Sequence, residues 1–220
     1  MWCVAKLDDE YIDRMEILLD LYQRPASETH PVVCLDEKPI VLREDFRQPT
    51  CCKPGRPPRR DYEYIKHGTA NAFVVVAPRL GQHMIEITPN RKAPMFAEML
   101  LKVSQMFSDA KRIHLVVDNL NTHVRKSVVG RYGEKAGDQL WKRFKVHYTP
   151  KHASWLNQAE IGISMFSSAC LKKRRISSIP HLTKEAAAYE KRANGEKRTI
   201  DWRFTKQKAR KKFGYYTQTL

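Results

Sequence analysis

The stretch Ile113-His114-Leu115-Val116-Val117-Asp118-Asn119-Leu120-Asn121-Thr122-His123 decides how this chain folds. Its apolar first half predicts a short strand that is buried on both faces, and this strand ends directly on an acid. A carboxylate at the end of a buried strand is costly unless a proton, a partner or a metal ion neutralises it. Ligand sites in open α/β sheets form at the carboxyl ends of the strands, so Asp118 is the first candidate for chemistry.

The residues after Asp118 also have a purely structural interpretation. Asn119, Asn121 or Thr122 can cap the helix that we expect over residues 123–136. Capping is the favoured role for these three side chains, whereas for Asp118 we favour function because of two further acids elsewhere in the chain.

The first of these acids follows another apolar run. The residues Val32-Val33-Cys34-Leu35 predict a strand that delivers Asp36, and Pro39 is expected to close it. Glu37 points to the opposite side if the strand continues, so it is expected to support the site or to lie on the surface.

The second acid is Glu160, which lies on a predicted helix. Residues 149–161 begin with turn chemistry and then enter this helix. Glu160 lies beside the apolar stripe of the helix, so it can point toward the sheet. The stripe is formed by Leu156, Ala159, Ile163, Phe166 and Cys170.

Periodicity predicts the remaining elements. Apolar residues spaced three and four apart indicate helices, and alternating or continuous β-branched runs indicate strands. Residues 43–70 are polar and rich in Pro and Arg, which predicts a long surface loop. We expect helices over 8–23, 92–108 and 181–193, a hairpin of strands over 72–78 and 83–88, and a strand over 143–148.

The chain of 220 residues carries a net charge of +16, and this charge is unevenly distributed. Residues 1–31 hold three basic and seven acidic side chains, whereas residues 171–220 hold fifteen basic and four acidic ones. A basic tail on a basic domain is typical of a polyanion partner, most simply nucleic acid. The alternative is a solvated charged face without a partner.

The cysteines and the hydropathy argue against a disulfide-rich protein, a zinc-stabilised fold and a membrane protein. Five irregularly spaced cysteines, two of them adjacent, predict reduced thiols in a cytosolic setting, with neither a disulfide framework nor a structural zinc ion. No apolar run is long enough to span a membrane, so no membrane partner is expected. The sequence also lacks a P-loop, a dinucleotide-binding glycine pattern and a serine-nucleophile elbow.

Two strand-end Asp residues and one helical Glu form a set of hard oxygen ligands, which suits Mg²⁺ or Mn²⁺. Three converging carboxylates would repel one another, and divalent cations remove that repulsion. Two such ions can activate a water molecule and stabilise the leaving oxygen of a phosphodiester.

Three motifs of the chain resemble those of mariner-type DDE transposases, most closely the bacterial insertion-sequence-630 branch. The motifs are Leu35-Asp36-Glu37-Lys38-Pro39, then residues 117–123 from Val117 to His123, and residues 147–160 from His147 to Glu160. The last motif is long and specific, and the resemblance covers residues 30–175.

The resemblance implies an α/β fold with a ribonuclease-H-like mixed sheet flanked by helices and a basic helical C-terminal tail. We expect an acidic N-terminal helix and linker over 1–29, the catalytic domain over 30–175 and the tail over 176–220. The implied activity is metal-dependent cleavage of phosphodiesters at the ends of a DNA element, followed by strand transfer into target DNA. Asp36, Asp118 and Glu160 would then be the catalytic and metal-binding triad, with two Mg²⁺ or Mn²⁺ ions.

Other residues are candidates for supporting roles. Asn119, His123, His152 and Asn157 are expected to contact the metal ligands or the substrate, although a surface position for His123 and a backbone contact for Asn157 are equally open. Asn157 precedes Glu160 by three residues, which would place both on one helical face. Trp155 is expected to pack internally. The candidates for contact with the DNA backbone are Arg59, Arg60, Lys172, Lys173, Arg174 and Arg175.

Two features depart from the family pattern. Forty-one residues separate Asp118 from Glu160, more than in typical members, and residues 130–140 are expected to be the insertion. Few residues precede the first strand, so we expect a truncated or frameshifted copy, or one part of a split gene, whose N-terminal DNA-binding part is separate. A homodimer on double-stranded DNA in the bacterial cytoplasm is the expected assembly. The alternatives are a non-catalytic DNA-binding remnant and a ribonuclease-H-like nuclease without strand transfer.

Overall fold

The computed structural model describes residues 7–172 and 174–215, and the described chain is built on one mixed β-sheet. The strand order is β3-β2-β1-β4-β5, with β1, β2 and β3 antiparallel and β1, β4 and β5 parallel. This arrangement confirms the mixed, ribonuclease-H-like sheet that the family resemblance implies. The strands are β1 (Val32–Asp45), β2 (Tyr64–Ala77), β3 (Gln82–Thr88), β4 (Ile113–Val117) and β5 (Phe144–Tyr148).

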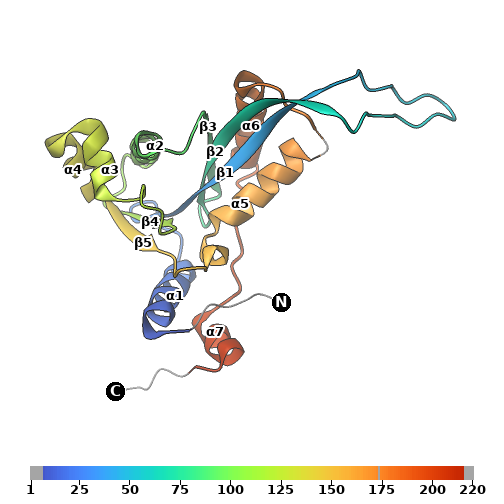
Figure 1. Ribbon diagram of the computed structural model, residues 1–220. Helices are drawn as coiled ribbons and strands as arrows, with labels where there is room; N and C mark the ends of the chain where they lie inside the picture. Colours follow the sequence, from blue (N-terminus) through green and yellow to red (C-terminus); the bar gives the residue numbers. More distant parts are fainter. Residues whose placement is uncertain (1–6, 173, 216–220) are drawn as a thin grey trace, which may run out of the picture.

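Helices cover both faces of the sheet, as Figure 1 shows. One face packs against α2 (Ala93–Met106), α3 (Arg125–Tyr132) and α4 (Glu134–Lys142). The other face packs against α1 (Asp9–Gln23), α5 (Ala159–Phe166) and α6 (Ile179–Gly195), and α7 (Lys206–Phe213) packs against α1. A 3₁₀ turn (Ser154–Leu156) precedes α5, and a π-helical turn (Ser167–Leu171) follows it.

Strand periodicity explains why β4 is apolar throughout. Leu115 and Val117 contact the core under α2, whereas Val116 between them contacts the core under α1. Successive side chains of a strand point to opposite faces, so a strand with helices on both faces must be apolar at every position. The predicted strand at 113–117 is therefore confirmed, as are the predicted helices over 8–23 and 181–193, which correspond to α1 and α6.

The predicted single helix over 123–136 is wrong, because the segment forms two helices. α3 ends at Tyr132 and α4 begins at Glu134, with Gly133 between them at φ +80°. A residue at positive φ cannot continue a right-handed helix, and glycine adopts this conformation without steric cost. The segment 130–140, the expected insertion, thus holds the end of α3, Gly133 and most of α4.

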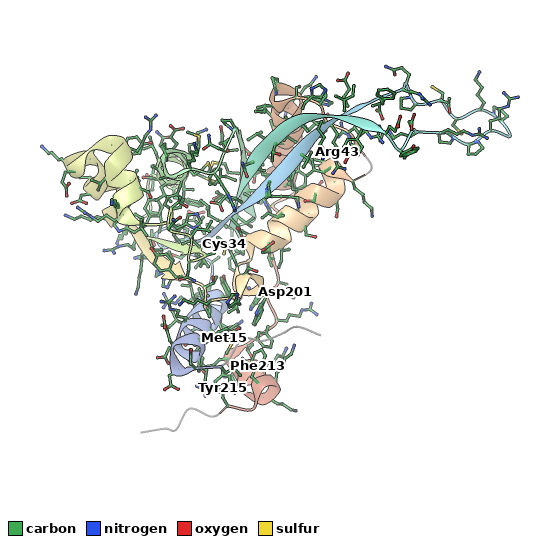
Figure 2. All side chains as sticks on the ribbon, in the orientation of Figure 1. Met15, Cys34, Arg43, Asp201, Phe213 and Tyr215 are labelled. Atoms are coloured by element: carbon green, nitrogen blue, oxygen red, sulfur yellow. The ribbon has the colours of Figure 1, made fainter. Side chains whose placement is uncertain are left out.

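The predicted loop over 43–70 is shorter than expected, because both flanking strands extend into it. β1 continues through Pro39 to Asp45, and its end pairs with the start of β2, so that Asp45 lies opposite Tyr64. Proline is tolerated because β1 pairs with β4 only over Val32–Cys34, so that beyond this point one of its sides is a free edge. The paired tips and residues 46–63 form an arm (residues 43–66) that projects from the sheet in Figures 1 and 2.

Arg175 holds the root of this arm. Its guanidinium donates to Asp45 Oδ1 at 2.9 Å, and to the backbone carbonyls of Asp61 and Glu63 at 2.6 Å each. The same group lies over the Tyr64 ring, 5.4 Å from its centroid. Only 12% of the Arg175 side chain is exposed. A planar, multiply hydrogen-bonded guanidinium is a strong link between segments that are far apart in the sequence.

Arg175→Ala is expected to raise the rate of thermolysin cleavage within residues 46–63 about 10-fold, because local opening governs proteolysis of such segments. Limited digestion followed by mass spectrometry measures this rate. Arg47→Ala is the matched control, since Arg47 is 73% exposed and contacts Asp61 at 3.4 Å. Equal rates in the two variants would show that Arg175 does not hold the arm.

The C-terminal helices pack on the rest of the fold. Asn194 of α6 bonds both the backbone N–H and the carbonyl of His83, and Glu190 accepts from the Ile85 N–H at 2.7 Å, so α6 satisfies the free edge of β3. Arg210 of α7 makes a two-pronged ion pair with Glu16 of α1 at 2.8 and 3.0 Å. The domain boundary at residue 176 stays a prediction. Among the described residues, no helix is long and apolar enough to cross a membrane.

Candidate active site

Asp36 lies where β1 leaves its parallel neighbour. The pairing of β1 with β4 ends at Cys34, opposite Val116, two residues before Asp36 and two before Asp118. Both acids therefore lie at the same edge, although Asp36 is inside a long strand rather than at its end. Asp36 is only 9% exposed, and its carboxylate accepts from the Glu37 N–H at 2.8 Å and from Asn157 Nδ2 at 3.3 Å.

Burial and neighbouring acids act together on Asp36. Burial raises the pKa of its carboxyl to about 7, the charges of Glu160, Glu37 and Asp118 add to the rise, and the Glu37 N–H opposes it. A carboxyl group without a cationic partner among other acids is the environment that a divalent cation would relieve.

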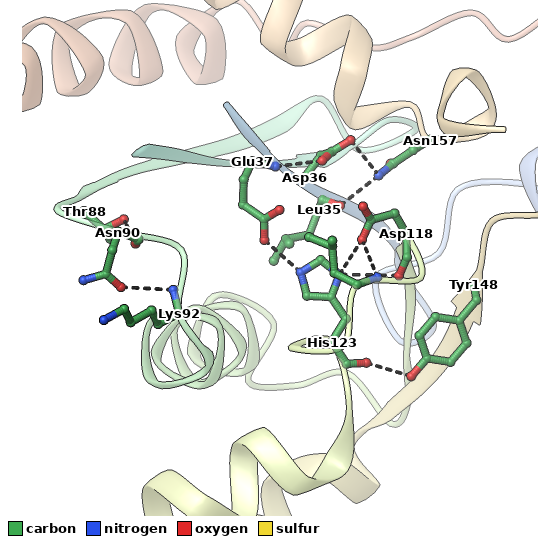
Figure 3. A network of polar contacts seen from close by, with 11 residues as sticks. Leu35, Asp36, Glu37, Thr88, Asn90, Lys92, Asp118, His123, Tyr148 and Asn157 are labelled. Carbon is green, nitrogen blue, oxygen red and sulfur yellow. Dashed lines mark hydrogen bonds and ion pairs between the residues drawn. The ribbon is translucent and has the colours of Figure 1, made fainter. Parts of the chain in front are cut away.

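Asp118 is half-buried and is held by the turn that follows β4. Its Oδ1 accepts from the Leu120 N–H at 3.2 Å and lies 2.7 Å from His123 Nδ1 (Figure 3). Burial alone would raise the pKa of Asp118, but the hydrogen bond from His123 and the positive charge of this ring lower it. The two aspartates thus have opposite pKa shifts, because one has a cationic partner and the other has none.

Glu160 lies in the first turn of α5 and is exposed. Its helix approaches the sheet closely because residue 162 is a glycine. A Cβ at this position would lie 2.5 Å from Val76 Cγ2 and 3.3 Å from Val74 Cγ1 on β2. The predicted stripe is confirmed as buried, although α5 ends at Phe166 and a π-helical turn carries Cys170.

Asn157 precedes α5 in extended backbone, so the expectation that it shares a helical face with Glu160 is wrong. Its side chain is fully buried and donates to the Leu35 carbonyl at 2.9 Å as well as to Asp36. Its Oδ1 accepts from the Ala159 N–H at 3.1 Å. Asn157 therefore ties the start of α5 to the strand that carries Asp36.

The donor chemistry of the three acids fits a hard divalent cation, since all the ligand atoms are carboxylate oxygens. In the described part of the chain, however, no three His, Cys, Asp or Glu side chains are gathered closely enough to hold one ion. The assignment of Asp36, Asp118 and Glu160 as metal ligands stays a prediction.

The other sequence-derived candidates have specific places. Asn119 Oδ1 accepts from Arg14 at 2.8 Å, and its amide donates to the Thr149 carbonyl. His152 is exposed at φ +59°, beside a hollow of about 220 Å³ between α1 and the loop after β5. Trp155 is half-buried and packs against Phe204 and Phe213, which confirms the predicted packing role.

Three of the six basic candidates have ion-pair partners within the described part of the chain. Arg60 pairs with Asp45, Arg174 with Glu185, and Arg175 holds the arm. Lys172 is exposed, Arg59 lies in the arm, and Lys173 lies outside the described residues. Their contact with DNA stays a prediction.

Sequence reasoning left Glu37 between a supporting and a surface role, and the structure places it in the interior. Its side chain is 2% exposed, and its Oε1 lies 2.8 Å from His123 Nε2. His123 is fully buried, so the alternative of a surface histidine is excluded. Because successive side chains of β1 alternate, Glu37 points to the other side of the strand from Asp36, as predicted. No local pattern in the sequence predicts its contact with His123, which lies 86 residues away.

A family model for DDE superfamily endonucleases matches residues 31–183 of the chain. No curated protein matches the chain in sequence.

Solved structures of Mos1 transposase are similar to this chain in fold. The paired-end complex with the left transposon end has a TM-score of 0.57 at 19% identity and covers 87% of this chain and 57% of its own. The mariner paired-end complex with Mn has a TM-score of 0.57 at 17% identity, over 87% and 58% of the two chains. The strand transfer complex has a TM-score of 0.56 at 16% identity, over 92% and 66%. This chain thus spans less than two thirds of the length of these relatives.

Proposed function

Because this chain belongs to the DDE superfamily endonucleases, we propose that it is the catalytic core of a mariner-type transposase of the insertion-sequence-630 branch. In this proposal it cleaves phosphodiesters at the ends of a DNA element and joins the freed ends to target DNA. The observation that carries the proposal is the buried Asp36, whose pKa is raised by burial and by the charges of Glu160, Glu37 and Asp118. Such an arrangement is costly to the fold and is typical of a functional site.

Asp36, Asp118 and Glu160 would hold the metal ions, Mg²⁺ or Mn²⁺. When bound, two such ions activate water and stabilise the leaving oxygen of a phosphodiester. The Mos1 structure solved with Mn supports this choice of cation.

The protein itself supplies position and charge. Asn157 and the Glu37 N–H hold Asp36, His123 holds Asp118, and Gly162 lets α5 bring Glu160 close to the sheet. Water attacks the phosphodiester at the element end, and the freed 3′-hydroxyl then attacks target DNA. The basic tail over residues 171–220 binds the DNA backbone, so DNA binding should weaken steeply as the salt concentration rises.

The assembly is part of the same proposal. The Mos1 complexes are paired-end and strand transfer complexes, which supports double-stranded DNA, both terminal repeats and target, as the partner. We include a homodimer, a separate N-terminal DNA-binding part and action in the bacterial cytoplasm, as the resemblance implies.

A second candidate is a non-catalytic DNA-binding remnant of a transposase. One observation favours it: the described residues contain no three potential ligands gathered around one metal position.

A cleavage assay separates the two candidates. We expect the wild type to nick supercoiled plasmid DNA, and to cut a duplex carrying its terminal repeats, with Mn²⁺ but not with a chelator. Asp118→Ala should lower the rate at least about 10³-fold, since removal of a catalytic group typically costs this much, while DNA binding by gel shift stays within about threefold. Equal cutting by wild type and variant would exclude Asp118 from catalysis, and DNA binding without any cutting would favour the remnant.

A further inference from the structure

The side chains of Glu37, His123 and Asp118 form a continuous bridge (Figure 3), in which Glu37 and His123 are buried and Asp118 is half-buried. His123 Nε2 lies 2.8 Å from Glu37 Oε1, and His123 Nδ1 lies 2.7 Å from Asp118 Oδ1. The imidazole ring is fully buried and faces Phe96 at a centroid distance of 4.5 Å. The ring therefore has little freedom to rotate.

The chemistry of the bridge follows from its atoms. An ionised carboxylate can only accept hydrogen bonds, so each ring nitrogen that faces one must donate. His123 Nδ1 faces Asp118 and His123 Nε2 faces Glu37, so one ring joins the two side chains. Burial of Glu37 without this partner would be costly, which explains why the acid and the histidine lie together.

The bridge also joins the two halves of the site. Backbone pairing between β1 and β4 ends at Cys34 and Val116, so no ladder hydrogen bonds hold Asp36 and Asp118 relative to each other beyond that point. Glu37 follows Asp36 on β1, and His123 belongs to the turn that carries Asp118. The side-chain bridge therefore links β1 to the turn after β4 beyond the last backbone hydrogen bonds between these two strands.

We propose that Glu37, acting through His123, is a positioning residue that fixes the orientation of the Asp118 carboxylate. His123 and the Leu120 N–H occupy Oδ1, which leaves Oδ2 as the oxygen for the cation. This inference rests on the proposed function, in which Asp118 binds a divalent cation. Partners that orient a metal ligand typically change metal affinity about 10- to 100-fold when they are removed.

The test measures Mn²⁺ binding to the full chain by isothermal titration calorimetry. Glu37→Leu fills the same interior space but cannot accept from His123, so we expect Mn²⁺ to bind about 10- to 100-fold more weakly. Glu37→Gln keeps an acceptor oxygen and should remain within about threefold of wild type. Rescue by the isosteric variant separates positioning from simple loss of packing.

Tyr148→Phe is the matched control. The Tyr148 hydroxyl donates to the backbone carbonyl of His123 at 2.7 Å, so this variant loosens the same turn without touching the ring. We expect its Mn²⁺ affinity to equal that of wild type. Unchanged affinity in Glu37→Leu, or an equal loss in Tyr148→Phe, would overturn the positioning role.

A second readout keeps this inference separate from the proposed function. A long-range ¹H–¹⁵N correlation spectrum of the metal-free chain should show the proton on His123 Nδ1 that bonds Asp118, and Glu37→Leu should shift this proton. If the wild type binds no Mn²⁺, the proposed function fails, and this spectrum alone decides the positioning role. An Nδ1 proton that does not shift in Glu37→Leu would overturn it.

Discussion

Replacing Asp36 with asparagine is expected to abolish cation-dependent DNA cleavage and, without cation, to make the protein more stable at pH 8. Asp36 is buried, and no described cationic side chain bonds to its carboxylate. Asparagine keeps the size of the side chain and removes a buried negative charge that the fold tolerates poorly. A substitution that raises stability and lowers activity is typical of a residue that serves function at a cost to the fold.

The sign of the stability effect follows from the pKa of Asp36. This pKa is about 7 in the folded protein, against an ordinary value of 3.8, because burial and neighbouring acids disfavour the charged form. The folded state therefore binds the proton more tightly than the unfolded state does. The wild type loses stability relative to Asp36→Asn as pH rises from about 4 through 7, and the two converge below about 4.

The expected gain at pH 8 is about 2–4 kcal/mol, since one pKa unit corresponds to about 1.4 kcal/mol. Urea unfolding in the presence of a chelator, at pH 5 and at pH 8, measures it. Cleavage with Mn²⁺ should fall at least about 10³-fold in the same variant.

Glu190→Gln is the control for this pair of effects. Burial also raises the pKa of Glu190, which lies on α6 and accepts from the Ile85 N–H. This variant should change stability in the same direction as Asp36→Asn and leave cleavage unchanged. A destabilised Asp36→Asn protein, or one that still cleaves DNA, would contradict the role given to Asp36.

Gly162→Ala is expected to lower both stability and cleavage, because the added methyl group has no space. Its Cβ would lie 2.5 Å from Val76 Cγ2, and this atom belongs to a buried β-branched side chain near the end of β2. The helix must move away from the sheet, which costs about 1–3 kcal/mol. Glu160 precedes this position by two residues and moves with the helix. A displacement of about 1 Å can lower a rate about 100-fold.

Gly81→Ala is the control that distinguishes the effect of lost stability from the effect of a displaced Glu160. Gly81 has φ +64°, and a Cβ there would lie 2.6 Å from the backbone of Lys197, so the variant is also destabilised. It lies in the turn between β2 and β3 and contacts none of the three acids. Cleavage per folded molecule, with folding measured by circular dichroism, should fall in Gly162→Ala and stay constant in Gly81→Ala. Equal losses in both variants would show that the effect is only one of stability.

Local patterns in the sequence predicted most elements of this fold. Continuous apolar runs identified β4 and the start of β1, and residues spaced three and four apart identified α1, α2 and α6. These predictions hold because burial on one or both faces imposes a period that neighbouring residues must satisfy. The strand pairing in the arm was not predicted, because the end of β1 and the start of β2 expose most of their side chains. Such segments show no alternation of apolar and polar residues.

The sequence by itself predicted the five strands, the helices α1, α2, α5 and α6, and the two acids at the edge where β1 and β4 part. Only the tertiary structure decided how those acids are held: Asp36 by Asn157, Asp118 by His123, and His123 by Glu37. The periodicity of apolar residues indicates which face of a helix or strand is buried, and this signal is local to that element. A hydrogen bond between residues 86 or 121 positions apart depends on how whole elements pack, which no local pattern contains.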